Sequence, residues 1–128
     1  MPSSLGRKFD RVVKWVNSHI LPEGKIYIRT VPNLRLSKQK VWGYCHIKSR
    51  KKCFIYICQG IEFPAAVDTL LHETAHYMEY LKTGVYYHKH ELQHSREWGI
   101  IYASVYREYH KWVDKQIDEN VKKNGEVG

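Results

Sequence analysis

The sequence predicts an α+β domain, because its segments fall into two classes with different hydrophobic periods. Three runs rich in aromatic and β-branched residues, at 25–31, 41–47 and 53–58, are typical of β-strands. Three longer stretches repeat apolar residues at the period of a helix. We expect a small, mostly antiparallel three-stranded sheet packed against the middle helix, with two further helices beside it. A chain of 128 residues has the length of one domain.

The first helix is predicted from apolar residues that recur at helical spacing between positions 5 and 16, before Pro22. Its other side carries Arg7, Arg11 and Lys14 at the same spacing. We predict that these bases contact nucleic-acid phosphates. The alternative interpretation is an ordinary solvent-exposed helix face.

Two polar segments separate the predicted strands. Residues 32–40 are expected to form a loop, and residues 48–52 are short enough for a hairpin turn. The hairpin turn concentrates four positive charges, on Lys48, Arg50, Lys51 and Lys52. Beside the aromatic residues of the strands, these bases suit nucleic acid, through phosphate contact and base stacking. A solvated turn is the alternative.

The middle helix contains the most informative motif, His72-Glu73-Thr74-Ala75-His76. An apolar stripe from Val67 to Leu81 predicts this helix, and Gly84 is placed to end it. Two histidines four residues apart project from one face of a helix, the separation that a single zinc ion needs from two imidazoles. Glu73 lies beside them, where its carboxylate can take a proton from water. Packing alone does not explain a glutamate on an otherwise apolar helix.

A catalytic zinc site needs three protein ligands and one open position, so a third ligand must follow the motif. The segment downstream offers His88, His90, Glu91, His94 and Glu97. The spacing of metzincins is excluded, because their glycine and third histidine are missing. Residue types and spacing leave His94 and Glu97 open.

The third helix is predicted to begin near Ser95, with Trp98, Ile101 and Val105 on one apolar stripe. Packing of this stripe against the middle helix would hold His94 close to the metal. From Asp118 onward the sequence is polar and interrupted by glycine, so we expect fraying there. The predicted organisation is a single domain at residues 1–117 and a polar tail at 118–128.

The charge of the chain indicates the chemistry of its partner. The formal net charge is +8 and the pI is about 9.4, which favours DNA, single- or double-stranded. Surplus charge that serves solubility is the alternative. We expect an intracellular protein, cytoplasmic or nucleoid-associated, because no apolar run spans a membrane and no signal-peptide segment is present. Three cysteines without C-x-x-C spacing indicate neither a disulfide framework nor a zinc ribbon.

The chain resembles the SprT-like metalloprotease family in the order of three features. These are the motif at residues 72–76, a connection of moderate length, and His94-Ser95-Arg96-Glu97-Trp98 at the start of a helix. In that family the third ligand is a histidine followed by glycine and then by an aromatic residue. His94 matches the histidine and Trp98 the aromatic residue, while Ser95 stands where glycine is usual. The resemblance covers about residues 40–112 and includes the strands before the motif.

The resemblance implies a minimal zincin-like domain without the C-terminal zinc ribbon of many members. It implies that His72, His76 and His94 hold Zn²⁺ and that Glu73 activates a zinc-bound water for peptide-bond hydrolysis. In zincins a strand at the lip of the cleft binds the extended peptide, which here points to residues 41–47. With the positive charge, the resemblance also implies substrates on or near DNA.

The predicted function is therefore that of a zinc-dependent endopeptidase acting on a protein or peptide, with two alternatives. One is a regulatory HExxH peptidase in which Glu97 is the third ligand. The other is a non-enzymatic nucleic-acid-binding module whose zinc is structural, with His88 or His90 as a fourth ligand.

Two auxiliary roles are predicted around the zinc site. A tyrosine would help to polarise the substrate carbonyl, with Tyr86, Tyr87 and Tyr102 as candidates. Asp68 and Glu79 fall near the histidine stripe and would either orient an imidazole or, as we prefer, be exposed helix carboxylates.

Overall fold

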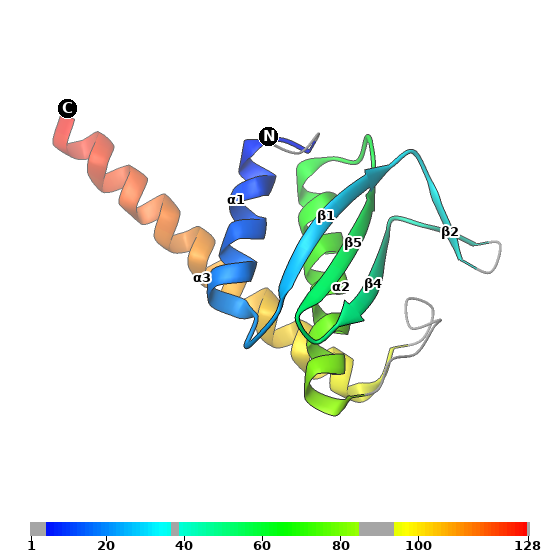
Figure 1. Ribbon diagram of the computed structural model, residues 1–128. Coiled ribbons are helices and arrows are strands. Elements are labelled where there is room, and N and C mark those ends of the chain that lie inside the picture. Colours follow the sequence, from blue (N-terminus) through cyan, green and yellow to red (C-terminus); the bar gives the residue numbers. More distant parts are fainter. Residues whose placement is uncertain (1–4, 37–38, 85–93, 128) are drawn as a thin grey trace.

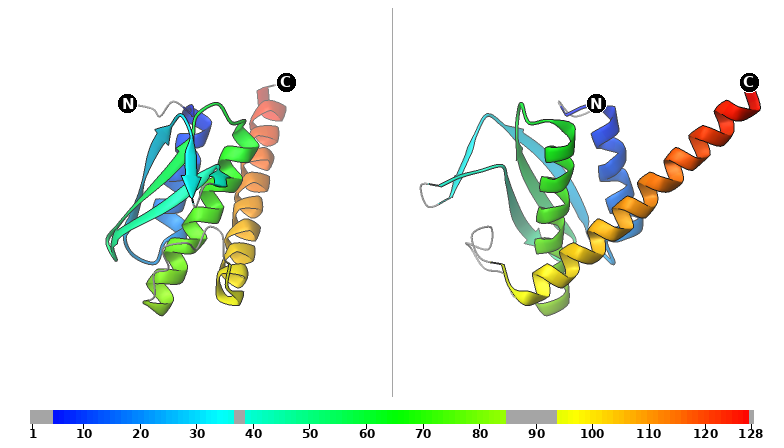
Figure 2. Two further views of the ribbon diagram at one scale, coloured as in Figure 1. Left: turned by 90° about the vertical axis from the view of Figure 1, so that its right-hand side faces the viewer. Right: turned by 180° about the vertical axis from the view of Figure 1, so that it is seen from behind.

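The computed structural model describes residues 5–36, 39–84 and 94–127. These residues form an α+β arrangement in which the helices lie on one side of a three-stranded sheet (Figures 1 and 2). The elements in chain order are α1 (Arg7–Trp15), a π-helical turn η1 (Val16–Ile20), β1 (Lys25–Val31), β2 (Leu34–Leu36), β3 (Gln39–Val41), β4 (Gly43–Ser49), β5 (Lys52–Cys58), α2 (Phe63–Thr83) and α3 (Arg96–Val127). The predicted fold class is confirmed at this level.

The three-stranded sheet has the order β1-β5-β4 and is mixed. A tight turn joins β4 to β5, and their pairing is antiparallel, with Tyr44 opposite Tyr56. β1 instead pairs in parallel with β5, with Tyr27 opposite Phe54. The prediction of a mostly antiparallel sheet was therefore wrong for one of the two pairings. The hairpin places its second strand, β5, between β1 and β4, and β1 and β5 run in the same direction.

A second, two-stranded sheet occupies part of the segment that was predicted to be a loop. β2 and β3 pair in antiparallel fashion, with Leu34 opposite Val41. Each strand has three residues, which is too short for an alternating pattern to stand out from a polar sequence. The predicted strand at 41–47 is also divided, because Trp42 separates β3 from β4.

The core lies between one face of the sheet and the helices. Alternate strand residues point inward and are buried, among them Ile26 at 1% exposure and Ile55 at 0%. Leu70 and Leu71 of α2 are at 0% exposure in the same cluster, together with Phe9 of α1. Each such side chain stabilises the fold by about 1.5 to 3 kcal/mol. Their packing holds α2, the helix with the HExxH motif, against β4 and β5.

The ends of the two long helices follow their sequence signals. Gly84 adopts the left-handed conformation at the end of α2, with φ of 75°, as predicted. Ser95 caps α3, since its hydroxyl oxygen accepts a hydrogen bond from the backbone N–H of Trp98 at 3.0 Å.

The C-terminal part of α3 continues past Asp118 to Val127 and projects away from the body of the domain (Figure 1). Fraying of this segment stays a prediction. Oppositely charged residues at i,i+4 spacing, such as Asp118 and Lys122, favour a helix on a solvent-exposed segment. Among the described residues, no helix combines the length and the apolar character needed to cross a lipid bilayer.

Candidate metal centre

α2 supplies the first two histidines of the candidate site. His72 and His76 lie one turn apart on the same face, with their ring centroids 5.0 Å apart. His76 is buried at 3% exposure, while the side chain of His72 is 26% exposed. Helical periodicity alone dictates this arrangement once the helix forms.

The third histidine comes from the residue before the N-cap of α3. His94 Nε2 lies 3.1 Å from His72 Nε2. His72, His76 and His94 each offer one ring nitrogen as a metal ligand, and these three nitrogens lie within 4.8 Å of one another. Tetrahedral zinc with Zn–N bonds of about 2.0–2.1 Å holds its nitrogens roughly 3.4 Å apart. The three histidines are therefore close enough to bind one metal ion.

Trp98 holds His94 in place. The indole and imidazole rings stack with centroids 3.9 Å apart and an interplanar angle of 13°. The indole N–H of Trp98 also donates a hydrogen bond to the backbone carbonyl of His72 at 3.3 Å. One buried side chain thus ties the start of α3 to the turn of α2 that carries the first histidine.

A second link joins the helices beside Trp98. The Ser95 hydroxyl donates a hydrogen bond to the carboxylate of Glu79 while its oxygen caps α3. Glu79 is 8% exposed, so our interpretation of this residue as an exposed carboxylate was wrong. Ser95 therefore does what glycine at this position cannot, because glycine has no side chain to bond Glu79 or to cap α3.

Glu97, the other candidate for the third ligand, lies in a different interaction. Its Oε1 is 2.5 Å from Nζ of Lys82 near the end of α2. The group of residues that could hold a metal ion contains His94 and does not include Glu97. The structure therefore brings His94 to the motif and directs Glu97 toward Lys82.

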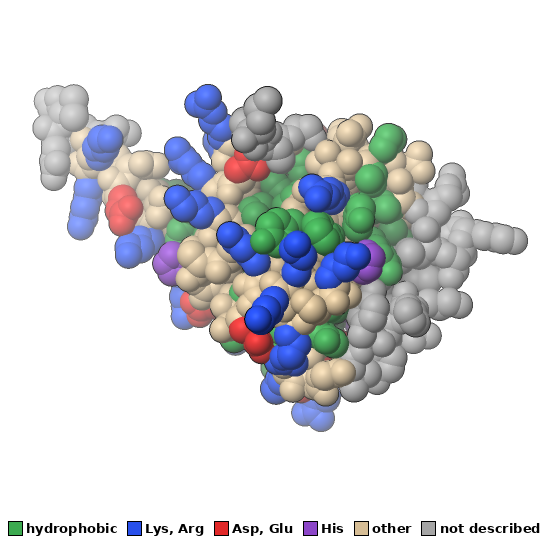
Figure 3. Space-filling model, viewed as in Figure 1, with side chains coloured by type: hydrophobic (Ala, Val, Ile, Leu, Met, Phe, Trp, Pro, Cys, Tyr) green, Lys and Arg blue, Asp and Glu red, His purple; other side chains and the backbone are tan. Residues whose placement is uncertain are grey.

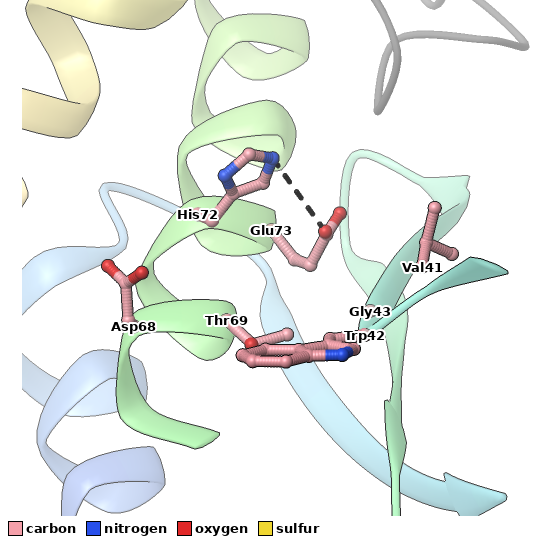
Figure 4. A pocket seen from close by; sticks show the side chains of 7 residues that line it. All are labelled: Val41, Trp42, Gly43, Asp68, Thr69, His72 and Glu73. Carbon is pink, nitrogen blue, oxygen red and sulfur yellow. Dashed lines mark ion pairs between the residues drawn. The ribbon is translucent and has the colours of Figure 1, made fainter. Parts of the chain in front are cut away.

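Glu73 projects into a pocket between α2 and the start of β4. It is buried at 2% exposure, and its Oε2 lies 3.9 Å from His72 Nε2. The pocket has a volume of about 260 Å³, and Figure 4 shows the Glu73 carboxylate between His72 and Val41. A buried carboxylate beside a histidine cluster and an open pocket can exchange protons with a molecule bound there.

Gly43 allows the strand to approach Glu73 closely. A Cβ atom on Gly43 would lie 2.3 Å from Cγ2 of Thr69 and 3.3 Å from Cγ of Glu73. Sequence reasoning did not identify Gly43, Thr69 or Trp42 as residues of the pocket. An isolated glycine in a strand signals a close backbone approach and would have pointed to Gly43.

Tyr102 and Asp68 form a pair on another side of His72. The Tyr102 hydroxyl donates a hydrogen bond to the Asp68 carboxylate, and its ring centroid lies 5.9 Å from that of His72. Burial, followed by the contact with Asp68, raises the pKa of Tyr102. The phenol therefore holds its proton tightly in the hydrogen bond that it donates to Asp68.

Five residues with predicted roles lie outside the described residues. They are Tyr86, Tyr87, His88, His90 and Glu91.

The predicted nucleic-acid contacts are distributed over two elements. Arg7, Arg11 and Lys14 are exposed on α1, and Lys48 and Lys51 are exposed at the hairpin turn.

The other two bases of the hairpin have specific partners. Arg50 donates hydrogen bonds to Glu23 and to the carbonyl of Leu81 at 2.6 Å. It therefore fastens the hairpin to α2. Lys52 lies over aromatic rings of the sheet, 5.4 Å from the centroid of Tyr27.

Comparison with known proteins finds no matching family model, no matching curated protein and no matching solved structure. The candidate metal centre therefore rests on this chain's own residues and their geometry.

Proposed function

We propose that the protein is a zinc-dependent endopeptidase of the SprT-like, zincin type. The observation that carries the proposal is the convergence of His72, His76 and His94 beside the buried carboxylate of Glu73. Three histidines and an adjacent general base are the protein groups that metal-assisted hydrolysis requires.

The donor set fits a catalytic zinc ion. Three imidazole nitrogens leave the fourth position of a tetrahedral ion available to water or substrate. The exposed position of His94 and the pocket beside His72 leave this side of the cluster accessible. When bound, zinc supplies Lewis-acid polarisation of a carbonyl and acidifies water.

Glu73 acts as the general base in the proposed reaction. Its carboxylate takes a proton from the attacking water and delivers it to the leaving amine. Burial beside His72 keeps the carboxylate at the pocket rather than in bulk solvent. The Tyr102 hydroxyl lies next to His72 and donates to Asp68, and we assign it an auxiliary role in orienting the substrate, for which it must turn from Asp68 toward the substrate.

The edge of the sheet supplies the proposed peptide site. β4 is an outer strand in the order β1-β5-β4, and its first residue, Gly43, lines the pocket that contains Glu73 together with Val41 and Trp42 just before it. An extended peptide that pairs with such an edge places its backbone along the strand. The net charge of +8 supports proteins associated with nucleic acid as the substrate class.

Metal content provides the first test. We expect about one zinc per chain in the wild type and a loss of most zinc in His94→Ala, measured by elemental analysis. Glu97→Gln is the matched control, because Glu97 is the neighbouring candidate ligand and lies against Lys82. Retention of zinc in His94→Ala with loss in Glu97→Gln would favour the regulatory peptidase with a glutamate ligand.

Cleavage of an unstructured basic protein, with and without DNA, provides the second test. We expect Glu73→Gln to retain zinc and to lose activity by about 10²- to 10⁴-fold, because it removes the general base. Glu97→Gln should retain activity. Full activity in Glu73→Gln would contradict the mechanism, and a wild type with zinc but no cleavage would favour structural zinc.

A further inference from the structure

The side of the sheet that faces away from the helices carries a concentrated set of rings and bases. We call it the outer sheet face and define it by six residues, Tyr27, Arg29, Tyr44, Lys52, Phe54 and Tyr56. Figures 1 and 2 show α1, α2 and α3 on the opposite side of the sheet. The described helices therefore do not cover this face.

The rings of the outer sheet face form two cross-strand pairs. Tyr27 and Phe54 are 5.7 Å apart between centroids, and Tyr44 and Tyr56 are 6.4 Å apart. Tyr27 is 38% exposed, and the other three rings are partly exposed. Phe54 and Tyr56 are alternate residues of one strand, so their rings are spaced by about 7 Å along it. Successive flat groups of an extended polymer can each lie on one of these rings.

Cations lie beside the same rings. The Arg29 guanidinium is 5.0 Å from the centroid of Phe54, and Lys52 Nζ is 5.7 Å from it. Lys25 pairs with Lys52 in the register of β1 and β5 and is also exposed. None of β1, β4 and β5 contains aspartate or glutamate. Figure 3, which views this face, shows Lys and Arg side chains gathered over the sheet.

We propose that the outer sheet face binds single-stranded nucleic acid. Unpaired bases expose flat faces that stack on aromatic rings or guanidinium planes, and the flanking phosphates attract lysine and arginine. A duplex buries the faces of its bases, so it would use the cations of this surface but not its rings. The combination of exposed rings and uniform positive charge therefore favours the single strand.

This binding surface is separate from the candidate metal centre. Inner-face residues such as Ile55, at 0% exposure, lie between the outer sheet face and α2. The two regions come together near the start of β4, where Tyr44 follows the pocket residue Gly43. The proposal therefore stands whether or not the protein cleaves peptides.

Fluorescence anisotropy with labelled oligomers tests the proposal. The probes are oligodeoxythymidine and oligouridine of about 20 nucleotides. They are titrated with the Glu73→Gln protein, so that the protein does not cleave itself during the measurement. We expect binding to at least one probe, with an affinity that falls as salt rises from about 50 to 200 mM. The tighter of the two identifies the preferred polymer. Absence of binding to both overturns the proposal.

Substitutions of one ring identify the surface. Tyr27→Leu retains apolar bulk against Phe54 but removes the ring, and we expect about tenfold weaker binding. Tyr27→Phe retains the ring and should bind like the parent. Tyr106→Leu is the matched control, since Tyr106 is 43% exposed on α3. Thermal unfolding confirms that each variant is folded. Unchanged binding in Tyr27→Leu, or an equal loss in Tyr106→Leu, overturns the proposal.

A charge substitution separates this face from α1. Arg29→Gln should reduce the slope of log Kd against log salt by about 0.7, the value for one phosphate contact on a single strand. Arg11→Gln removes the same charge from α1, the competing phosphate-binding surface predicted from the sequence, and should leave the slope unchanged if the outer sheet face is the binding site. The reverse result would assign binding to α1. Competition by a duplex or by polyglutamate as strong as that by the single strand would overturn the role of stacking.

Discussion

The two faces of the three-stranded sheet differ in composition although they belong to the same strands. The inner face presents Ile26 and Ile55, both at 1% exposure or less, to the helices. The outer face presents Tyr27 and Phe54 together with Arg29 and Lys52. Adjacent residues of a strand point to opposite faces, so one segment can satisfy two different chemical environments.

Contact with the helices explains the side chains of one face of the sheet but not those of the other. Burial against the helices accounts for the inner face and fixes α2, which supplies His72, Glu73 and His76. Burial against the helices does not account for the four partly exposed rings flanked by cations on the outer face. The inner face therefore holds the candidate metal centre in place, and the outer face is available for a partner.

The largest expected change in stability comes from substituting Ile55, whose neighbour Phe54 points to the opposite face of the sheet. Ile55→Ala creates a cavity in the core and should lower the free energy of unfolding by about 2 to 5 kcal/mol. Phe54→Ala removes a larger but partly exposed side chain and should lower it by less. Urea denaturation measures both values. A greater loss in Phe54→Ala would show that the outer face also supports the fold.

Gly43 tests whether the inner face shapes the pocket. Gly43→Ala places a methyl group 2.3 Å from Cγ2 of Thr69, so β4 or α2 must shift. We expect a loss of about 1 to 3 kcal/mol in the free energy of unfolding and a clear fall in the rate of the proposed peptidase reaction.

The matched control is Gly99→Ala in α3, where no atom outside the local helix lies within 4 Å of the added Cβ. Alanine there should raise stability by up to about 1 kcal/mol, because it favours the helix. Equal behaviour of the two variants would mean that the close approach at Gly43 has no functional role.

The smallest effect should appear at alkaline pH. Tyr77 of α2 is fully buried and donates a hydrogen bond to the carbonyl of Arg50 at 2.7 Å. Burial, and secondarily the nearby Cys53, raises the pKa of Tyr77 from 10.0 to about 12. The folded state therefore holds its proton more tightly than the unfolded state. Its contribution is complete below pH 10 and is lost between about pH 10 and pH 12.

The resulting loss in the free energy of unfolding amounts to about 1.4 kcal/mol by pH 11. Denaturant midpoints measured across this range provide the test. Tyr77→Phe should lower stability at neutral pH by about 1 kcal/mol, through the lost hydrogen bond, and reduce the alkaline decline. If the free energy of unfolding of Tyr77→Phe declined with pH as much as that of the wild type, the decline would belong to other titratable groups.

Much of the candidate site could be predicted from local spacing. The positions of His72, Glu73 and His76 on one helix follow from the helical period, and the ends of that helix follow from its apolar stripe and Gly84. The choice between His94 and Glu97 could not be made in this way. It depends on how the start of α3 is rotated against α2, which the contact of Trp98 with the His72 carbonyl and the bond of Ser95 with Glu79 determine.

The sequence by itself determined the helices, the three main strands and the residues able to ligate a metal, because each is encoded within a few neighbouring positions. Only the tertiary structure decided the parallel pairing of β1 with β5, the third histidine and the approach of Gly43 to Glu73. These features join residues far apart in the chain, and their geometry results from packing the whole domain. The same packing placed the described helices on one side of the sheet and left the outer sheet face uncovered by them (Figure 2).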